Sequence, residues 1–238
     1  MTDKVVIVTG AGQGLGEAIA KTLGAAGAMI CGCDIKANEV KKVAQAINDG
    51  GGTARSYVLD VRNEDDVNHT MDHIMAEHGR IDVLVNNAGT DTTLPIEDLS
   101  IADWDRVLDV NLRGPFLLSK AIYPFLKHQG KGHIVNITST AAKRVWTEAT
   151  AYHASKWGLL GFSHALHAEA RRYNVKVTAV VVGGMRTPFI LERFPETDPG
   201  VLQDPQNVAE TIHFVLTQPD ETVIPEVMVL PMRETSWP

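Results

Sequence analysis

Tyr152 and Lys156 are the two residues whose types and spacing point most directly to chemistry. They lie four positions apart in the run YHASK, inside a pattern that predicts a helix from Ala151 to Tyr173, so their side chains share one face. An ammonium group beside a phenol favours the phenolate, which lowers the tyrosine pKa from its ordinary value of about 10. The pair therefore predicts a general acid and base with a lowered tyrosine pKa.

A serine that precedes this pair could hold the oxygen of a substrate. Ser139 ends the strand-like run HIVNITS, and open α/β sheets place their ligands at the carboxyl ends of strands. Taken singly, a serine at this place is often only a cap, and a Tyr/Lys pair on a helix is often only solvated. The spacing of all three residues together favours one catalytic site.

The stretch TGAGQGLG at residues 9–16 follows the apolar run VVIV and predicts a turn that binds phosphate. Its glycines fit the spacing T-G-x-x-x-G-x-G rather than G-x-G-x-x-G. A turn without Cβ atoms lets pyrophosphate approach the backbone, and the helix that follows offers its first N–H groups to an anion. A structural glycine turn is the alternative. The cofactor-binding residues expected here are Gly10, Gly12, Gln13, Gly14, Leu15 and Gly16.

Asp34 ends the second strand-like run and predicts that the bound dinucleotide is NAD. A carboxylate at this place accepts hydrogen bonds from the two ribose hydroxyls of an adenosine and repels a 2′-phosphate. Neither Gln13 nor Ile35 supplies the arginine that commonly neutralises that phosphate, and Lys36 is the nearest basic residue. An aspartate that only caps the next helix is the alternative.

Alternating strand-like and helical segments must position these residues. Apolar runs predict seven strands, near residues 5–9, 28–34, 54–60, 81–87, 133–139, 176–182 and 222–230. Helical patterns lie between them, beginning near residues 14, 38, 64, 103, 151 and 206. This alternation is typical of an α/β fold with a doubly wound parallel sheet covered on both faces. We expect a single domain over residues 1–238, with a proline-containing lid at about 186–205.

The composition excludes several classes of partner. A net charge of −7 leaves no basic excess for nucleic acid or an anionic membrane, and no run of eighteen apolar residues occurs. The N-terminus has no signal-peptide pattern, which favours a cytoplasmic protein. Cys31 and Cys33 are expected to fill the core, and no metal is predicted because the nine histidines lack a metal-binding spacing. His153, His164 and His167 are expected at the surface or at an interface.

Six pieces in one order resemble the short-chain dehydrogenase/reductase family. They are TGAGQGLG, LDV at 59–61, NNAG at 86–89, Asn111 in VNLRG, Ser139 in IVNITS and YHASK at 152–156. The resemblance implies a Rossmann domain, hydride transfer to or from nicotinamide and, commonly, a homotetramer. It implies that Asn111, Ser139, Tyr152 and Lys156 are catalytic, with Asn111 holding a water through which Lys156 passes the proton to solvent.

The same resemblance extends the cofactor site. Asp60 and Val61 are implied to hold the adenine. The turn of Asn87, Ala88 and Gly89 is implied to steady the sheet beside the cofactor, which Tyr152 and Lys156 also contact. The family's P-G-x-x-x-T pattern is VGGMRT here, so Gly183 and Thr187 match while Val182 replaces the proline. Thr187 is expected to reach the nicotinamide amide.

These residues predict an NAD-dependent oxidoreductase that interconverts a secondary alcohol and a ketone, with Tyr152 as the acid and base. A non-catalytic dinucleotide-binding regulator on the same fold is the alternative. The substrate class stays open among polyols, sugars and hydroxy acids. Arg144, Arg186 and Arg193 could surround an anionic substrate, or Arg186 could serve the pyrophosphate while the other two are solvated. Trp146 could line the pocket or only pack.

Overall fold

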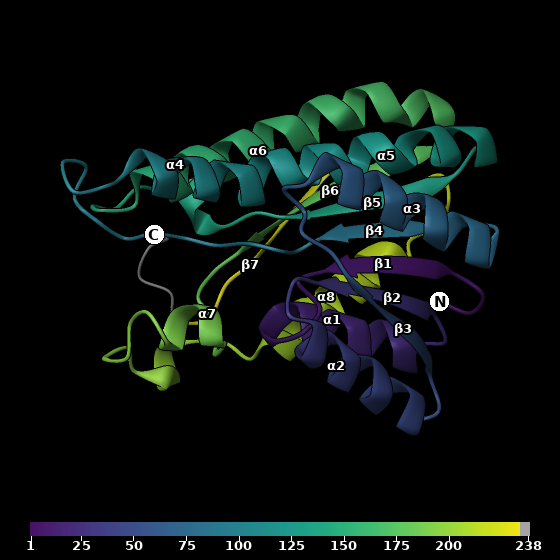
Figure 1. The fold of residues 1–238 in the computed structure, drawn as a ribbon, viewed down its shortest axis with the longest axis horizontal. Helices are drawn as coiled ribbons and strands as arrows, with labels where there is room; N and C mark the ends of the chain where they lie inside the picture. The colour runs from purple at the N-terminus through teal and green to yellow at the C-terminus, as the bar shows by residue number, and fades with distance from the viewer. Residues whose placement is uncertain (234–238) are drawn as a thin grey trace.

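A seven-stranded parallel sheet in the order β3-β2-β1-β4-β5-β6-β7 forms the centre of the computed structural model, which describes residues 1–233 (Figure 1). Its strands are β1 Val5–Thr9, β2 Met29–Asp34, β3 Thr53–Val58, β4 Val83–Asn86, β5 Gly132–Ile137, β6 Val175–Val182 and β7 Glu226–Val229. The chain reverses its direction of winding between β1 and β4, where doubly wound sheets bind ligands. The predicted fold class is confirmed.

Helices cover both faces of the sheet. One layer holds α1 (Gly14–Ala25), α2 (Ala37–Asp49) and α8 (Pro205–Leu216), and the other holds α3 (Glu64–His78), α4 (Ile101–Leu108), α5 (Gly114–Gln129) and α6 (Thr150–Ala170) (Figure 1). Alternate side chains of β1 serve the two layers: Val6 and Val8 pack in one core, and Val5 and Ile7 in the other. Burial on both faces explains why the strands are continuous apolar runs.

Both cysteines lie in the second of these cores. Cys31 and Cys33 are fully buried and pack with Ile7 and Leu84. Burial raises the pKa of both thiols, that of Cys31 to about 12. Their predicted role as core residues is confirmed.

The helix predicted from about Asp103 to Lys127 is interrupted in its middle. A π-helical segment, Asp109–Arg113, joins α4 to α5, and Asn111 lies inside it. Pro115 has no N–H to donate to the carbonyl of Asn111 four residues earlier. Proline at this position therefore weakens the regular helical ladder where the π segment occurs.

The segment predicted as a lid lies beyond the carboxyl ends of the strands and contains the short helix α7 (Pro188–Leu191) (Figure 1). Its two ends are tied together, since the Arg186 N–H donates to the Gln203 carbonyl at 2.9 Å and the Gln203 N–H to the Gly184 carbonyl at 3.1 Å. Closure over a substrate remains a prediction. The C-terminal run PMRETSWP could pack on a partner subunit or fray, and most of it, residues 234–238, lies outside the described residues.

Within residues 1–233, no helix is both long and apolar enough to cross a membrane.

Candidate active site

The turn between β1 and α1 has the shape and the donors that fit a pyrophosphate. Gly10 and Gly14 have φ angles of +65° and +59°, which favour glycine. A Cβ on Gly16 would collide with the Gly10 carbonyl oxygen, so the helix packs directly on the turn. Gln13 precedes α1 without capping it through its side chain. The first N–H groups of α1 are therefore left for an anion.

Asp34 is bonded to this turn. Its Oδ2 accepts the Gly12 N–H at 2.9 Å, and its Oδ1 accepts the Lys36 N–H at 2.9 Å. Lys36 is the residue that precedes α2, and it has no side-chain cap, so Asp34 is not the capping residue of that helix. Lys36 Nζ donates to Gln13 Oε1 at 3.3 Å. The carboxylate thus lies where the glycine turn, Gln13 and Lys36 meet.

The residues expected to hold the adenine lie after β3. Asp60 forms a two-pronged ion pair with Arg62, at 2.9 Å from Nε to Oδ1 and 2.7 Å from Nη2 to Oδ2. The Arg62 hydrogen bonds hold the pKa of Asp60 below its usual value. Val61 is buried and packs closely against Gly114 at the start of α5.

The turn after β4 is fastened to the end of β1. The Thr9 hydroxyl accepts the backbone N–H groups of Asn87 and Ala88 at 3.0 and 3.1 Å. The Asn87 amide donates to the Thr9 and Gly10 carbonyls at 2.9 and 3.2 Å. Thr9 and Asn87 therefore hold the two turns on either side of the switch point in one arrangement.

Ser139, Tyr152 and Lys156 meet at the carboxyl end of β5. Ser139 Oγ accepts the Ala141 N–H at 3.1 Å and is hydrogen-bonded to Tyr152. Lys156 Nζ lies 5.6 Å from the centre of the Tyr152 ring and donates to the Ile137 carbonyl at 3.0 Å. The structure thus brings together the serine, tyrosine and lysine that the sequence singled out.

The pKa of Tyr152 departs from the prediction in this chain. Burial raises it to about 12, against the lowering effect of the Ser139 hydrogen bond. Burial lowers the pKa of Lys156 to about 8, which weakens the positive charge expected to favour a phenolate. The predicted lowering is therefore wrong for the chain by itself, because desolvation outweighs the i,i+4 charge effect.

Asn111 is fully buried beside this group. Its Oδ1 accepts the Thr90 N–H and its Nδ2 donates to the Thr90 carbonyl, both at 2.8 Å, and Nδ2 also donates to Ser155 Oγ at 3.0 Å. A Cβ on Gly89 would point between Asn111 Oδ1 and Lys156 Nζ, at 3.6 and 3.8 Å. Because Gly89 has no side chain, the space beside Asn111 Oδ1 and Lys156 Nζ stays open.

The residues that follow β6 border the glycine turn between β1 and α1. Val182 pairs with Val229 of β7, so the backbone stays extended without the family's proline. The Gly183 N–H donates to the Val229 carbonyl at 3.0 Å. Thr187 is buried and borders the glycine turn, since a Cβ on Gly14 would lie 3.3 Å from its Cβ.

His153 was expected at the surface or at an interface, and this expectation is wrong. It is buried, with Nδ1 2.9 Å from the Ala141 carbonyl and Nε2 accepting the Trp146 N–H at 3.1 Å. Both contacts suit one neutral tautomer with its proton on Nδ1. The Trp146 ring lies edge-on at 4.4 Å between centroids. His153 therefore holds the loop after Ser139 against α6, and the Trp146 ring, which is 42% exposed, contacts it.

The three arginines proposed around a substrate differ in their surroundings, and one of them, Arg186, is engaged within the lid segment. Arg186 donates to the Leu202 carbonyl at 2.6 Å and approaches Asp204 at 3.4 Å. Arg193 stacks on Phe189, with Cζ 3.9 Å from the ring centre, and Phe189 lies 6.0 Å from the Tyr152 ring. Arg144 is exposed on the loop after Ser139. Phe189 was not predicted, and it comes near Tyr152 only through the course of the lid.

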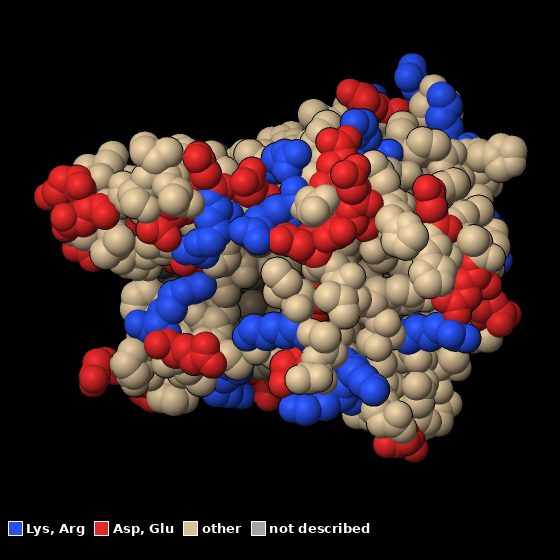
Figure 2. Space-filling view, in the orientation of Figure 1, with Lys and Arg blue, Asp and Glu red and all other residues tan. Residues whose placement is uncertain are grey.

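A hollow is visible on the face at the carboxyl ends of the strands, between the two helical layers (Figure 2). Lys and Arg side chains lie around much of its rim, with Asp and Glu side chains among them. This distribution suits a ligand that carries a pyrophosphate, although the sequence as a whole is acidic.

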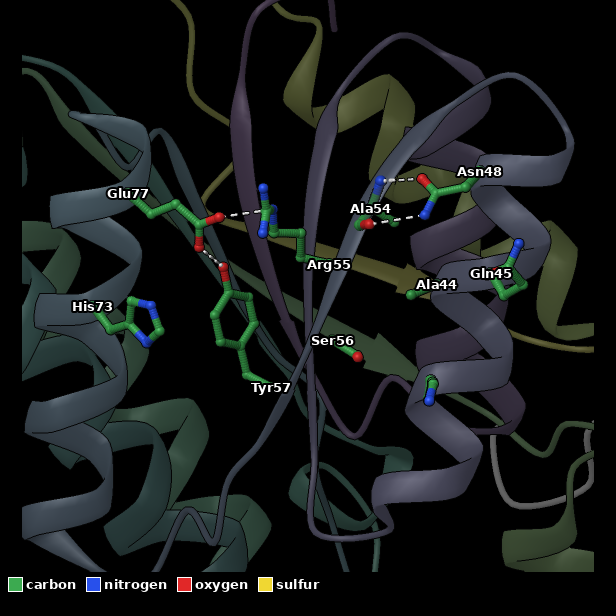
Figure 3. Close-up of a pocket in the computed structure, with 10 residues that line it drawn as sticks. Ala44, Gln45, Asn48, Ala54, Arg55, Ser56, Tyr57, His73 and Glu77 are labelled. Carbon is green, nitrogen blue, oxygen red and sulfur yellow. Dashed lines mark hydrogen bonds and ion pairs between the residues drawn. The ribbon is translucent and has the colours of Figure 1, made fainter.

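A second hollow, of about 450 Å³, lies at the edge strand β3, between α2 and α3 (Figure 3). Its polar groups bind each other: Glu77 accepts from Arg55 at 2.7 Å and from the Tyr57 hydroxyl at 2.8 Å. Asn48 bonds to both backbone groups of Ala54, at 2.7 and 3.0 Å. These contacts join β3 to α2 and to α3, which explains the polar residues that line the hollow. Among the described residues no group of His, Cys, Asp and Glu is arranged for a metal.

The chain belongs to the short-chain dehydrogenase family, whose model matches residues 4–197. It is 32% identical over 232 residues to an uncharacterized oxidoreductase of Staphylococcus aureus (strain N315), covering 98% of this chain and 99% of that protein. A D-threitol dehydrogenase of Mycolicibacterium smegmatis is 39% identical over 177 residues, 74% of this chain and 68% of that protein.

A solved structure of a metagenomic short-chain oxidoreductase in complex with NADP has the same fold. The two chains are 34% identical, with a TM-score of 0.88 and coverage of 98% of this chain and 99% of that one. The chain is thus an oxidoreductase of this family, with a nicotinamide dinucleotide as its class of cofactor.

Proposed function

We propose that this chain is an NAD-dependent dehydrogenase that interconverts a secondary alcohol of the polyol class and the matching ketone. The observation that carries the proposal is the meeting of Ser139, Tyr152 and Lys156 at the sheet edge that also holds the glycine turn. The 39% identity to a D-threitol dehydrogenase supports a polyol as substrate.

Each of the four residues has a separate task in the oxidising direction. Tyr152, as phenolate, accepts the hydroxyl proton of the alcohol while Ser139 holds the same oxygen. Lys156 in its ammonium form stabilises the phenolate, and it returns the proton to solvent through a water at Asn111. When bound, an oxidised nicotinamide supplies the hydride acceptor and a further positive charge near Tyr152. In the reducing direction Tyr152 donates the proton to the ketone oxygen.

Asp34 supports NAD rather than NADP as the cofactor. Its carboxylate is fixed at the glycine turn by the Gly12 N–H, so a 2′-phosphate beside it would meet a fixed negative charge. Lys36 contacts Gln13 through its ammonium group and is the basic residue available to offset that charge.

The test is NAD-linked oxidation of a panel of polyols by the purified protein, followed by absorbance of the reduced cofactor. We expect Tyr152→Phe to lower kcat by several orders of magnitude and to leave NAD affinity nearly unchanged, because it removes a proton acceptor. Tyr123→Phe keeps the ring that packs on Tyr173 and lies outside the predicted site, so it is the matched control and should keep wild-type turnover.

Near wild-type turnover by Tyr152→Phe would show that another group is the base. NAD binding without turnover of any alcohol would instead favour a dinucleotide-binding regulator.

A further inference from the structure

Asp91 lies in the loop after β4, and this loop is held rigidly. Asn111 binds both backbone groups of Thr90 at 2.8 Å. Arg106 donates to the hydroxyls of Thr90 and Thr92, at 2.7 and 2.6 Å. Asp91 therefore lies between Thr90 and Thr92, which are held in place by hydrogen bonds from Asn111 of the π segment and Arg106 of α4.

Arg193 approaches the same place from the lid segment. Its guanidinium lies 3.9 Å over the Phe189 ring and donates to the Phe189 carbonyl at 3.2 Å. The Phe189 ring lies 6.0 Å from the Tyr152 ring, tilted against it. Stacking on Phe189 thus brings a positive charge to the catalytic phenol.

Asp91 and Arg193 both act on Tyr152, in opposite directions. The Asp91 carboxylate raises the pKa of Tyr152, and Arg193 lowers it. The Asp91 oxygens accept the Thr92 N–H at 2.7 Å and the Thr93 hydroxyl at 3.3 Å. A carboxylate offers about four acceptor sites and a guanidinium five donors, so both groups keep capacity for a ligand.

We propose that Asp91 and Arg193 bind a second hydroxyl of a neutral polyol, next to the hydroxyl that Tyr152 and Ser139 hold. The second hydroxyl donates to Asp91 and accepts from Arg193. This assignment rests on the proposed function and names the residues that select its substrate.

The two charges also explain what the site rejects. Asp91 repels an anionic substrate and Arg193 repels a cationic one, so the pair favours a neutral molecule. A monohydric alcohol leaves both partly buried charges without the hydroxyl they bind, and such sites discriminate strongly against the molecule that lacks it.

The test compares threitol with 2-butanol, which has the same number of carbon atoms, at saturating NAD. We expect Asp91→Ala to lower kcat/KM for threitol by about 10- to 100-fold, the effect of one hydrogen bond to a charged group. The value for 2-butanol should change by less than about threefold. Asp91→Asn, which can still accept the Thr92 N–H, should also lose selectivity, because it removes the charge and not the turn.

Two further variants complete the design. Arg193→Met keeps an unbranched side chain over Phe189 and removes the guanidinium, so it should lower kcat/KM for threitol selectively. Asp98→Ala, an exposed aspartate on the same segment, is the control and should leave the threitol preference unchanged. Thermal unfolding of each variant checks that the fold is intact.

Equal losses for threitol and 2-butanol would overturn the assignment and leave Asp91 with a structural role in its loop. A wild-type preference for a four-carbon sugar acid over threitol would also overturn it, in favour of anion binding by Arg193. In both cases turnover with NAD would leave the proposed function standing. Absence of any NAD- or NADP-linked turnover by the wild type would remove that function and this inference together.

Discussion

Burial acts on Tyr152 and Lys156 in opposite directions and leaves each closer to its neutral form. The phenol has a pKa of about 12 and the amine one of about 8. Opposite shifts in two neighbouring groups are typical of sites that move a proton. Burial thus disfavours the Tyr152 phenolate in the chain by itself, and the positive charge of an oxidised cofactor would oppose that effect.

The Asp34 carboxylate leads to a prediction about the choice of cofactor. We expect NAD to exceed NADP in kcat/KM by at least about tenfold, or about 1.4 kcal/mol, because the 2′-phosphate meets the Asp34 carboxylate. Asp34→Ala should narrow this gap, and steady-state kinetics with both cofactors measures it. Asp49→Ala, at the end of α2, is the control. Equal use of both cofactors by the wild type would refute the role assigned to Asp34.

Two buried side chains near the site hold loops against helical segments that are distant from them in the chain. His153 ties the loop after β5 to α6 through Ala141 and Trp146, and Asn111 ties the loop after β4 to the π segment through Thr90. Both are buried side chains whose polar atoms bind backbone. We infer that these two fastenings keep Ser139 and Asp91 at fixed distances from Tyr152.

His153 allows this inference to be tested. His153→Phe keeps a ring against Trp146 and removes both hydrogen bonds, leaving the buried Ala141 carbonyl without its partner. We expect a loss of about 1–3 kcal/mol in the free energy of unfolding, measured by urea denaturation, and a fall in kcat. His128→Phe, at an exposed position on α5, should change neither. Unchanged stability and kcat in His153→Phe would show that the loop holds its position without this residue.

The sequence predicted the strands, their helices and the glycine turn because these depend on local patterns. A π segment at Asn111 changes the helix by one residue, which is too little to alter an apolar periodicity. The pKa of Tyr152 was mispredicted because it depends on the burial of the phenol in the folded chain, which the i,i+4 spacing does not report. Asp91 and Arg193 interact electrostatically with each other and with Tyr152 only through the tertiary fold. Tertiary packing, rather than local pattern, decides each of these features.

The whole molecule presents apolar side chains on the outer faces of α5 and α6. Phe116 and Trp157 are 46% and 49% exposed, and the Phe116 ring packs edge-on to Phe162 at 6.2 Å. Exposed aromatic side chains gathered on one face are typical of an interaction surface. We propose that these helices pair across two-fold axes in a homotetramer.

Light scattering after size exclusion should give the mass of four chains. Trp157→Asp combined with Phe116→Asp should reduce it, because two charges would be buried at each pairing surface. Phe214→Asp, at a 58% exposed position on α8 in the other layer, is the control and should keep the assembly. A wild-type mass of one chain at micromolar concentration would contradict the proposal.

The burial of Cys31 and Cys33 has a practical consequence for following the lid. They are the two cysteines of the sequence, and both are inaccessible and held as thiols by a raised pKa, whereas reagents that label cysteine attack an exposed thiolate. A cysteine introduced at Glu196, which is exposed on the lid segment, would therefore be the one position that a maleimide fluorophore modifies in the folded protein. Distances from this label to a bound cofactor then report lid movement without removal of any native residue from the core.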